Sequence, residues 1–333
     1  MMATIEELAR HIEVAEDLQS VVRTMKTISA VGIRSHELAE LAMSRYLETV
    51  ELGLQVVLRA IEGTRAEDQP LEGERTAVVL VGSEIGLCGA FNEQLVTFAL
   101  QSLAATGVGA GERFVLTIGA RADASWRAEA EPPAAHEEAP ATVEALAHTV
   151  GAVLTRLDHW REKEAVGRLE LFHHRPGERG GATTVRARLL PLDPAWLTAL
   201  RARTWSSHGL PVAAGPPETL FRRLIRQLLF ARVFTAVIQS RTAEHAERLA
   251  AMQAADRSIA EKIDDLHVAH RLRRQDVITS ELLDLISGYE AITGDTAAKA
   301  DHKVRRLVPG PAPEPAESGI GSSSRTAGLS APD

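Results

Sequence analysis

Residues 221–266 read FRRLIRQLLFARVFTAVIQSRTAEHAERLAAMQAADRSIAEKIDDL and contain no proline. Stepping through this stretch by three and four residues visits 14 positions, of which ten are apolar. These positions are Phe221, Leu224, Leu228, Ala231, Thr235, Ile238, Thr242, His245, Leu249, Met252, Asp256, Ile259, Ile263 and Leu266. Such sustained spacing predicts a coiled-coil helix, which needs a partner helix to cover its apolar seam.

The N-terminal stretch offers that partner. The same spacing from Ile5 to Ile61 gives 17 positions, of which 12 are apolar, and the polar ones gather between Gln19 and Glu40. At 1.5 Å per residue, helices over residues 4–61 and 218–292 would be ~87 Å and ~110 Å long. A compact chain of this length has a radius of gyration of only ~20 Å. We therefore expect a protruding rod, most simply an antiparallel pair of helices.

The distribution of the 15 prolines divides the chain. None precedes Pro70, ten lie from Pro70 to Pro217, none lies between Glu218 and Val308, and five follow. Because proline costs a helix interior roughly 3 kcal/mol, the proline-free stretches are the helix candidates. The predicted parts are a coiled-coil helix over 1–69, a globular domain over 70–217, a second coiled-coil helix over 218–300, and a disordered Pro/Gly/Ser-rich tail over 301–333.

The sequence pattern of the middle part is typical of an α/β domain. Short β-branched runs predict strands over 76–82, 113–119, 166–172 and 183–190, and helices are predicted over 91–103 and 142–160. Strands that alternate with helices indicate a Rossmann-like α/β sheet. The fold class is thus α/β, with a long antiparallel coiled coil of the N- and C-terminal helices.

Composition excludes several classes of protein. Of the 333 residues, 45% are hydrophobic and 25% are charged, which is enough apolar material for a core. No apolar run approaches the ~18 residues of a transmembrane helix, and the start lacks a basic region before an apolar stretch, so a targeting peptide is not expected. A net charge of −8 disfavours nucleic-acid binding, and the single cysteine, Cys88, excludes an internal disulfide.

No group of residues has the pattern of a catalytic, cofactor or metal site. The segment from Gly82 to Gly89 follows a strand, but its spacing fits neither dinucleotide nor phosphate-loop motifs, and tight turning is the simpler interpretation. Cys88 is interpreted as a packed thiol, and His173 and His174 as surface or strand histidines without metal-ligand spacing. The adjacent acids at 264–265 cannot share one helix face. We therefore expect no catalytic residue, no cofactor and no bound metal.

Polar residues interrupt the helical rod at a few places. Lys26 falls on the seam, where a charge is costly unless it emerges or finds a partner. Basic clusters occur at 222–226 and 271–274, the second followed by Gln275, Thr279 and Glu281. These residues form either a solvated helix surface or a band that faces a partner protein.

Four segments resemble the gamma subunit of F-type ATP synthases. Met25-Lys26-Thr27-Ile28-Ser29-Ala30 is similar to its Met-Lys-x-x-(Ala/Ser)-Ala segment, and residues 83–92 are similar to its S-D-R-G-L-C-G-x-x-N turn. Residues 240–255 resemble its S-E-H-A-x-R-M helix signature, and residues 274–282 resemble its closing R-Q-x-x-I-T-x-E-I. The four segments occur in the family's order and cover roughly residues 4–292.

The resemblance implies a rotor shaft without catalytic residues of its own. Such a shaft would couple ion translocation at a membrane c-ring to ATP synthesis or hydrolysis in a hexamer of alpha and beta subunits, with the epsilon subunit as a further partner. It would lie peripherally at the cytoplasmic face of a bacterial inner membrane. The residues implied to contact the beta subunits are Met25, Lys26, Arg248, Arg274, Gln275, Thr279 and Glu281. The residues implied to build a structural turn are Gly82, Gly86, Cys88, Gly89 and Asn92.

The chain also departs from that family's pattern. Glu84-Ile85 replaces the usual Asp-Arg of the turn, Arg271 replaces an asparagine, and residues 1–51 hold nine acidic side chains against five basic ones. These departures favour a divergent or alternate-complex version. Two other functions fit the residues: a cytoplasmic coiled-coil scaffold with a small-ligand-binding α/β head, and a soluble enzyme with its site at the turn that begins at Gly82.

Overall fold

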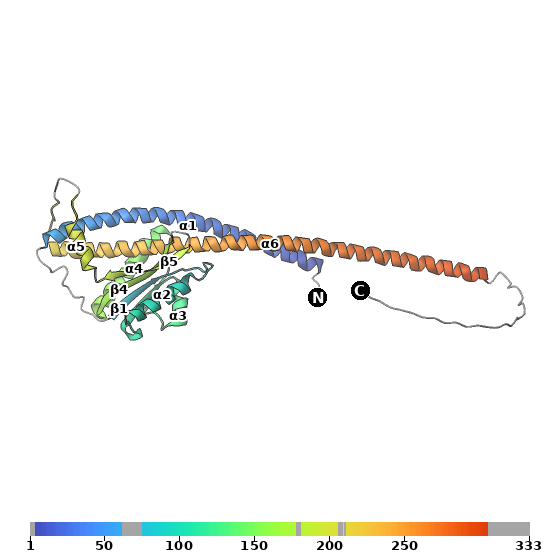
Figure 1. The fold of residues 1–333 in the computed structure, drawn as a ribbon, viewed down its shortest axis with the longest axis horizontal. Coiled ribbons are helices and arrows are strands. Elements are labelled where there is room, and N and C mark those ends of the chain that lie inside the picture. Colours follow the sequence, from blue (N-terminus) through green and yellow to red (C-terminus); the bar gives the residue numbers. More distant parts are fainter. Residues whose placement is uncertain (1–3, 62–74, 178–180, 206–208, 210, 306–333) are drawn as a thin grey trace, which may run out of the picture. The chain divides into compact units, whose positions relative to one another are not determined.

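The computed structural model describes residues 4–61, 75–177, 181–205, 209 and 211–305 (Figure 1). Residues 7–267 form one compact unit, and the other described residues, 4–6 and 268–305, belong to a second. The proposed start of the globular domain at Pro70 and most of the predicted tail, residues 306–333, lie outside the described residues. The four-part division of the chain stays a prediction.

Within residues 7–267, the two long helices run antiparallel, as predicted. Helix α1 spans Ile5–Ala60, and helix α6 spans Pro217–Arg305 and so continues past residue 300, the predicted end of the second coiled-coil helix. Rising residue numbers on α1 meet falling numbers on α6. The contacts pair Lys26 with Asp256, His36 with His245, Glu40 with Gln239, and Tyr46 with Gln227. The antiparallel pairing therefore holds from Lys26 to Tyr46 of α1.

Lys26 finds a partner across the seam. Its Nζ lies 2.9 Å from Oδ2 of Asp256, and the Nε of Arg23 lies 3.4 Å from Oδ1 of the same carboxylate. The hydrogen bond from Lys26 lowers the pKa of Asp256. The polar residue at each of these two seam positions is thus paired with the other, and neither charge is left inside the apolar seam.

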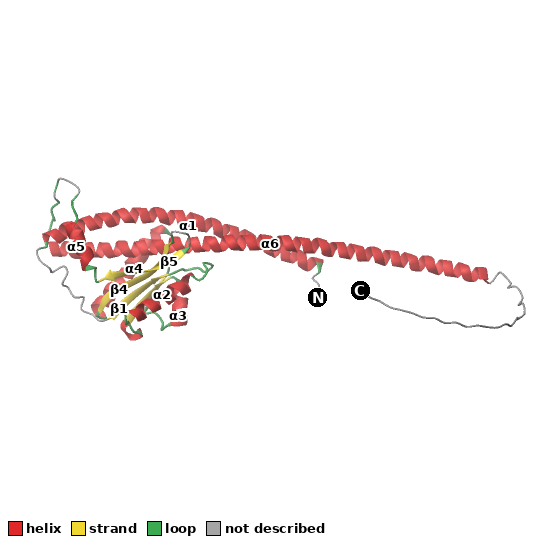
Figure 2. Ribbon diagram, viewed as in Figure 1, coloured by secondary structure: helices red, strands yellow, loops and turns green. Residues whose placement is uncertain are grey.

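The globular part is a five-stranded sheet in the order β3-β2-β1-β4-β5 (Figure 2). Neighbouring strands are parallel except β5, which runs antiparallel to β4. The strands are β1 (Arg75–Val81), β2 (Arg113–Ile118), β3 (Ala135–Glu137), β4 (Val166–Pro176) and β5 (Ala182–Leu190). The four strands predicted from β-branched runs are confirmed, and β3 was missed because three residues carry no periodic pattern.

Four shorter helices complete the domain. They are α2 (Phe91–Ala105), α3 (Ala120–Glu129), α4 (Val143–Lys163) and α5 (Pro194–Ala202). Helices α2 and α4 match the predicted ones. Helix α3 buries only Ala122 and Trp126, and α5 only Leu197 and Leu200, so each presents a single helical turn of apolar spacing, which is too short to predict a helix.

Strand β1 shows why the α/β class could be predicted. Its alternate residues Ala77 and Val79 pack on one side with side chains of α4 and α6, whereas Val78 and Leu80 pack on the other side with α2 and α3. A strand covered on both faces reads as a continuous apolar run, as this one does. The long helix α6 is therefore part of the domain's own core, through residues such as Leu229, Val233 and Ile238.

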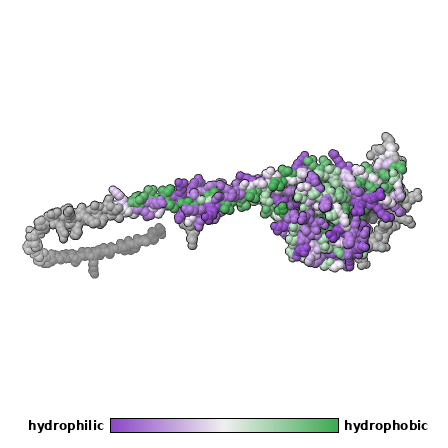
Figure 3. Space-filling model, turned by 180° about the vertical axis from the view of Figure 1, so that it is seen from behind, coloured by the Kyte–Doolittle hydropathy of each residue, from purple (hydrophilic) through white to green (hydrophobic). Residues whose placement is uncertain are grey.

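Apolar side chains remain exposed on both long helices (Figure 3). Val14, Leu18, Val21, Ile28 and Val31 of α1 are each more than half exposed. Residues 268–305 of α6, which belong to the second unit, are called the separate segment of α6. Leu272, Leu283 and Leu285 of this segment are likewise more than half exposed. Among the described residues, no helix has the length and hydrophobicity that crossing a membrane requires.

Candidate functional site

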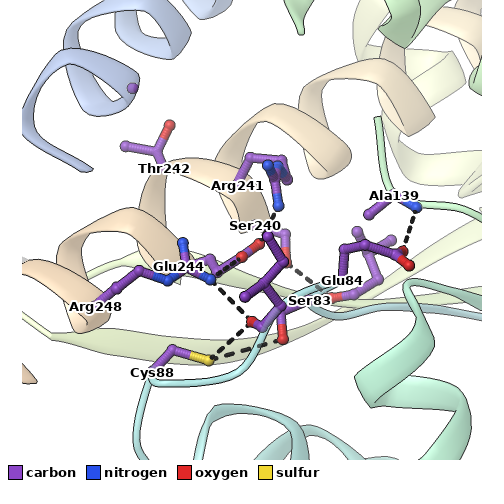
Figure 4. A network of polar contacts seen from close by, with 12 residues as sticks. Ser83, Glu84, Cys88, Ala139, Ser240, Arg241, Thr242, Glu244 and Arg248 are labelled. Atoms are coloured by element: carbon purple, nitrogen blue, oxygen red, sulfur yellow. Dashed lines mark hydrogen bonds and ion pairs between the residues drawn. The ribbon is translucent and has the colours of Figure 1, made fainter. Parts of the chain in front are cut away.

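The most concentrated polar structure of the described chain surrounds residues 82–90, which we call the central turn (Figure 4). The turn connects β1 to α2 and carries all but one of the predicted structural residues, the last being Asn92 at the start of α2. The side chain of Asn92 accepts a hydrogen bond from the Ser83 amide at 3.0 Å and donates one to the Ser83 hydroxyl at 2.9 Å. Both ends of the turn are thereby tied together.

Glycine is required at Gly82 because the turn packs against α3. A Cβ there would lie 2.5 Å from the Cβ of Ala122 and 2.6 Å from Oδ1 of Asn92. Gly89 has a positive φ of 63° in open space, which suits a residue without a side chain. Cys88 is buried, and burial raises the pKa of its thiol, so the group stays protonated at neutral pH. Its position agrees with a packing role and not with a nucleophile.

Glu84 binds the neighbouring backbone. Its Oε2 accepts hydrogen bonds from the amides of Ala120 at 3.2 Å and Ala139 at 3.0 Å. Ala120 is the first residue of α3, and a helix N-terminus favours a negative charge. The N-terminus of α3 is thus occupied by a carboxylate of the chain itself.

Helix α6 supplies the other side of the site. The hydroxyl of Ser240 donates to the carbonyl of Val81, the last residue of β1, at 2.8 Å. The guanidinium of Arg248 donates to the carbonyls of Ile85 at 2.9 Å and Gly86 at 3.3 Å. These bonds join the long helix directly to the end of the central strand and to the turn that follows it.

A buried ion triad, formed by Arg241, Glu244 and Arg248, holds these donors in place (Figure 4). Oε2 of Glu244 lies 2.5 Å from Nη1 of Arg241, and Oε1 lies 2.6 Å from Nη2 of Arg248. The side chain of Glu244 is only 1% exposed. Removing one partner of a buried charge network leaves an uncompensated charge, so the triad is costly to break.

Buried histidines lie on both sides of the triad. His36 of α1 and His245 of α6 face each other across the seam, with ring centroids 5.4 Å apart. His173 donates from Nε2 to Oε1 of Gln239 at 3.1 Å, and His174 stacks on Phe91 at a centroid distance of 3.8 Å. Burial lowers the pKa of His173 to about 4 and those of His174 and His245 to about 3. These histidines are therefore neutral at physiological pH.

The predicted contact residues lie in different surroundings. Met25 and Lys26 are half-buried on α1, whereas Arg274, Gln275, Thr279 and Glu281 are exposed on the separate segment of α6. Arg248 is buried, and its guanidinium is engaged by Glu244 and the central turn. The beta-subunit contacts implied for these residues stay predictions.

Pattern reasoning missed the roles of Ser240, Arg241 and Glu244. The available signal was a pair of arginines, one three residues before and one four residues after a single glutamate, in a stretch whose seam positions Thr242 and His245 are polar. Charges at that spacing usually decorate a solvated helix face. Their burial depends on the sheet that packs over them, which the helix periodicity alone does not reveal.

Helix α6 occupies the position at which open α/β sheets commonly bind a ligand. In open α/β sheets, ligands bind outside the carboxyl ends of the strands, at the point where strand order reverses. Here that point lies between β1 and β4, and it is occupied by Ser240 and Gln239 of α6, which contact Val81 and His173. The arrangement fastens a helix to a sheet. Among the described residues, no three His, Cys, Asp or Glu side chains gather in a way that could hold a metal ion.

Fold and site together define a class of protein: an antiparallel helical hairpin with an α/β domain inserted between its halves. The family model described as ATP synthase matches residues 4–292, and the chain belongs to this family. The gamma chain of ATP synthase from Rubrobacter xylanophilus is 28% identical over 301 residues, which cover 87% of this chain and 99% of the relative. The gamma chain from Bdellovibrio bacteriovorus is 24% identical over 300 residues, covering 88% of this chain and 100% of the relative.

Solved structures share the fold. The rotor of the Euglena gracilis mitochondrial ATP synthase contains a chain that matches with a TM-score of 0.58 at 14% identity, covering 82% of this chain and 98% of that one. A chain in the OSCP/F1/c-ring structure of the same enzyme matches with a TM-score of 0.57 at 16% identity, covering 88% and 95%. The resemblance to gamma subunits stated from four sequence segments is thus confirmed.

Proposed function

We propose that this chain is the rotor shaft in the central stalk of an F-type ATP synthase. It transmits torque between an ion-driven membrane ring and the catalytic beta subunits, and it is a non-catalytic subunit of that complex. The observation that carries the proposal is the antiparallel pairing of α1 with α6, combined with an α/β domain that shares its core with α6. A stiff rod anchored to a globular foot suits the transfer of torque.

The family and its members support the same role. The relatives are gamma chains, and a related fold occurs in a chain of an ATP synthase rotor. By this relationship the partners are the alpha and beta subunits of the catalytic hexamer, the epsilon subunit and the membrane c-ring. The chain would be held peripherally, through these partners, at the cytoplasmic face of a bacterial inner membrane.

Assembly tests the proposal directly. We expect co-expression of this chain with the alpha and beta subunits of the same genome to give a complex with one copy of the chain per alpha-beta hexamer. The measurement is native mass spectrometry of the purified complex, with the chain alone and the hexamer alone as controls. If no complex of this composition forms, the rotor-shaft proposal is wrong.

The coupling contacts can be tested by a double substitution. Arg274 and Gln275 are exposed on α6 and are proposed to reach acceptors on the beta subunits. We expect Arg274→Ala with Gln275→Ala to lower coupled turnover about tenfold, because losing charge-assisted hydrogen bonds costs roughly 1.5–3 kcal/mol. The same double substitution should leave the yield of complex unchanged.

A matched control uses two other exposed residues of the same segment, one charged and one neutral and polar, in the variant Asp276→Ala with Ser280→Ala. These lie outside the proposed contact set, so turnover should stay near that of the unaltered complex. If the Arg274/Gln275 variant turns over as fast as the unaltered complex, these two residues do not form the proposed contact. The family to which the chain belongs is not affected by that result.

A further inference from the structure

We propose that Ser240, Arg241, Glu244 and Arg248 form the mechanical joint through which torque passes between the α/β domain and helix α6. The inference rests on the proposed rotor function and adds the residues that perform one step of it. We call these four residues the joint. They are positioning residues, since the bonds described for them hold α6, β1 and the central turn together.

Apolar packing and directional hydrogen bonds differ in how well they resist rotation of a helix about its axis. The α/β domain holds α6 mainly by apolar packing, through residues such as Val233 and Ile238. Apolar burial is non-directional, so it resists separation of the helix from the sheet better than sliding around the helix axis. Directional, charge-assisted hydrogen bonds resist such sliding, because their strength falls when the atoms move sideways.

The joint supplies those directional bonds along one stretch of the helix. The planar guanidinium of Arg248 is held by the carboxylate of Glu244 and donates to the carbonyls of Ile85 and Gly86. Ser240 lies two turns earlier on α6 and donates to Val81. The helix is therefore fixed to the domain at two points along its length, and a twist about its axis would have to break both.

The joint is bonded to the centre of the sheet and to the turn that follows its middle strand. Val81 ends β1, which is the middle strand of the sheet and pairs with both β2 and β4. The central turn, which carries the other receiving carbonyls, is closed at its base by the bonds between Asn92 and Ser83. Force applied at the joint thus enters a strand that is hydrogen-bonded on both sides and a turn whose two ends are tied together.

The ion triad fixes the side chains of the joint within α6 itself. Glu244 lies between two arginines, three residues from Arg241 and four from Arg248, and its side chain is 1% exposed. Water therefore cannot readily replace either guanidinium as its partner. The carboxylate fixes the orientation of Arg248, which is what allows that residue to hold two carbonyls at once.

The experiment uses the complete ATP synthase in lipid vesicles, with Glu244→Gln and Ser240→Ala made separately. Two quantities are measured: ions transported per ATP hydrolysed, and the torsional stiffness of the rotor, from the angular fluctuations of a probe on the α/β domain. Each variant is expected to lower the stiffness at least twofold and to lower the ion-to-ATP ratio, while ATP hydrolysis continues. If Glu244→Gln fails to assemble, Ser240→Ala carries the measurement, because it removes one neutral hydrogen bond.

The chain offers a matched control and a rescue. Thr242 is buried on the same stretch of α6, but its hydroxyl bonds only to the carbonyl of Ile238 in its own helix, so Thr242→Ala should change neither quantity. Ala243 lies in one apolar cluster with Cys88 of the central turn, so Ala243→Cys is made as the partner for a disulfide with Cys88, and thiol titration shows whether that bridge forms. Oxidation should restore stiffness and ratio in the Glu244→Gln background, an outcome that a purely structural role of Glu244 does not predict.

Failure of the proposed rotor function and failure of the proposed joint give different results. If the unaltered chain forms no complex with alpha and beta subunits, the rotor function is wrong and the joint loses its purpose. If the complexes assemble and transport ions, and Glu244→Gln and Ser240→Ala leave both stiffness and ratio unchanged, the joint is wrong and the rotor function stands.

Discussion

Replacing Gly119 by alanine should lower the free energy of unfolding by about 3 kcal/mol or more, through backbone strain and overpacking. Gly119 has a φ of 98°, and a Cβ there would lie 2.6 Å from the carbonyl oxygen of Ser83. That carbonyl accepts a hydrogen bond from the Arg121 amide at 3.0 Å, and the Gly119 amide donates to Glu137 at 2.9 Å. Neither backbone segment can move away without breaking one of these bonds.

Urea unfolding of the full chain, followed by circular dichroism, measures this loss. Gly151 provides the control, because it lies inside α4 and a Cβ added there would meet no atom within 4 Å outside its own helical turn. Gly151→Ala should raise stability by about 0.5–1 kcal/mol, the difference in helix propensity between the two residues. An effect of Gly119→Ala as small as that of an exposed substitution would show that the central turn rearranges.

Acid should destabilise the chain strongly between pH 6.5 and about 4. His173, His174 and His245 have folded-state pKa values of about 4, 3 and 3, all below the ordinary value of 6.5. The unfolded chain therefore binds more protons than the folded chain in this range, so stability is fully present above pH 6.5 and falls as the pH falls. At pH 5 each histidine contributes a loss of roughly 2 kcal/mol, or ~6 kcal/mol in all.

His174→Phe isolates one of these groups. Neither ring nitrogen of His174 has a hydrogen-bond partner, and the ring stacks on Phe91, so an apolar ring suits the site. The slope of unfolding free energy against pH should fall by about 1.4 kcal/mol per pH unit between pH 5 and 6. Urea unfolding at several pH values checks this, and an unchanged slope would mean that His174 is already charged in the folded chain.

The helical hairpin and the sheet class could be predicted from the sequence, because both depend on patterns that repeat along it. The apolar spacing through Leu228 and Leu249 is long enough to distinguish a coiled coil from an ordinary helix. The run in β1 is apolar at nearly every position because it is covered on both faces. Elements such as β3 and α5 are too short, at three and nine residues, for a pattern to repeat, and so they were missed.

The joint was beyond such reasoning for a different physical reason. Arg241, Glu244 and Arg248 have the spacing of a solvated ion-pair ladder, and they are buried only by tertiary packing, which includes the docking of the central turn on Arg248. The turn and this helix segment are far apart in sequence, and no local pattern links them. Resemblance to a family marked both segments but did not show that one is bound to the other.

The insertion of the α/β domain between the two halves of the hairpin has a consequence during synthesis. Lys26 and Asp256 meet across the seam although they are 230 residues apart. At 5–20 residues per second, a ribosome needs roughly 10–50 s to make the second after the first. For that time α1 has left the ribosome with its apolar seam uncovered, and the sheet still lacks the wall that α6 provides. We therefore expect the nascent chain to expose this apolar surface until α6 has been synthesised.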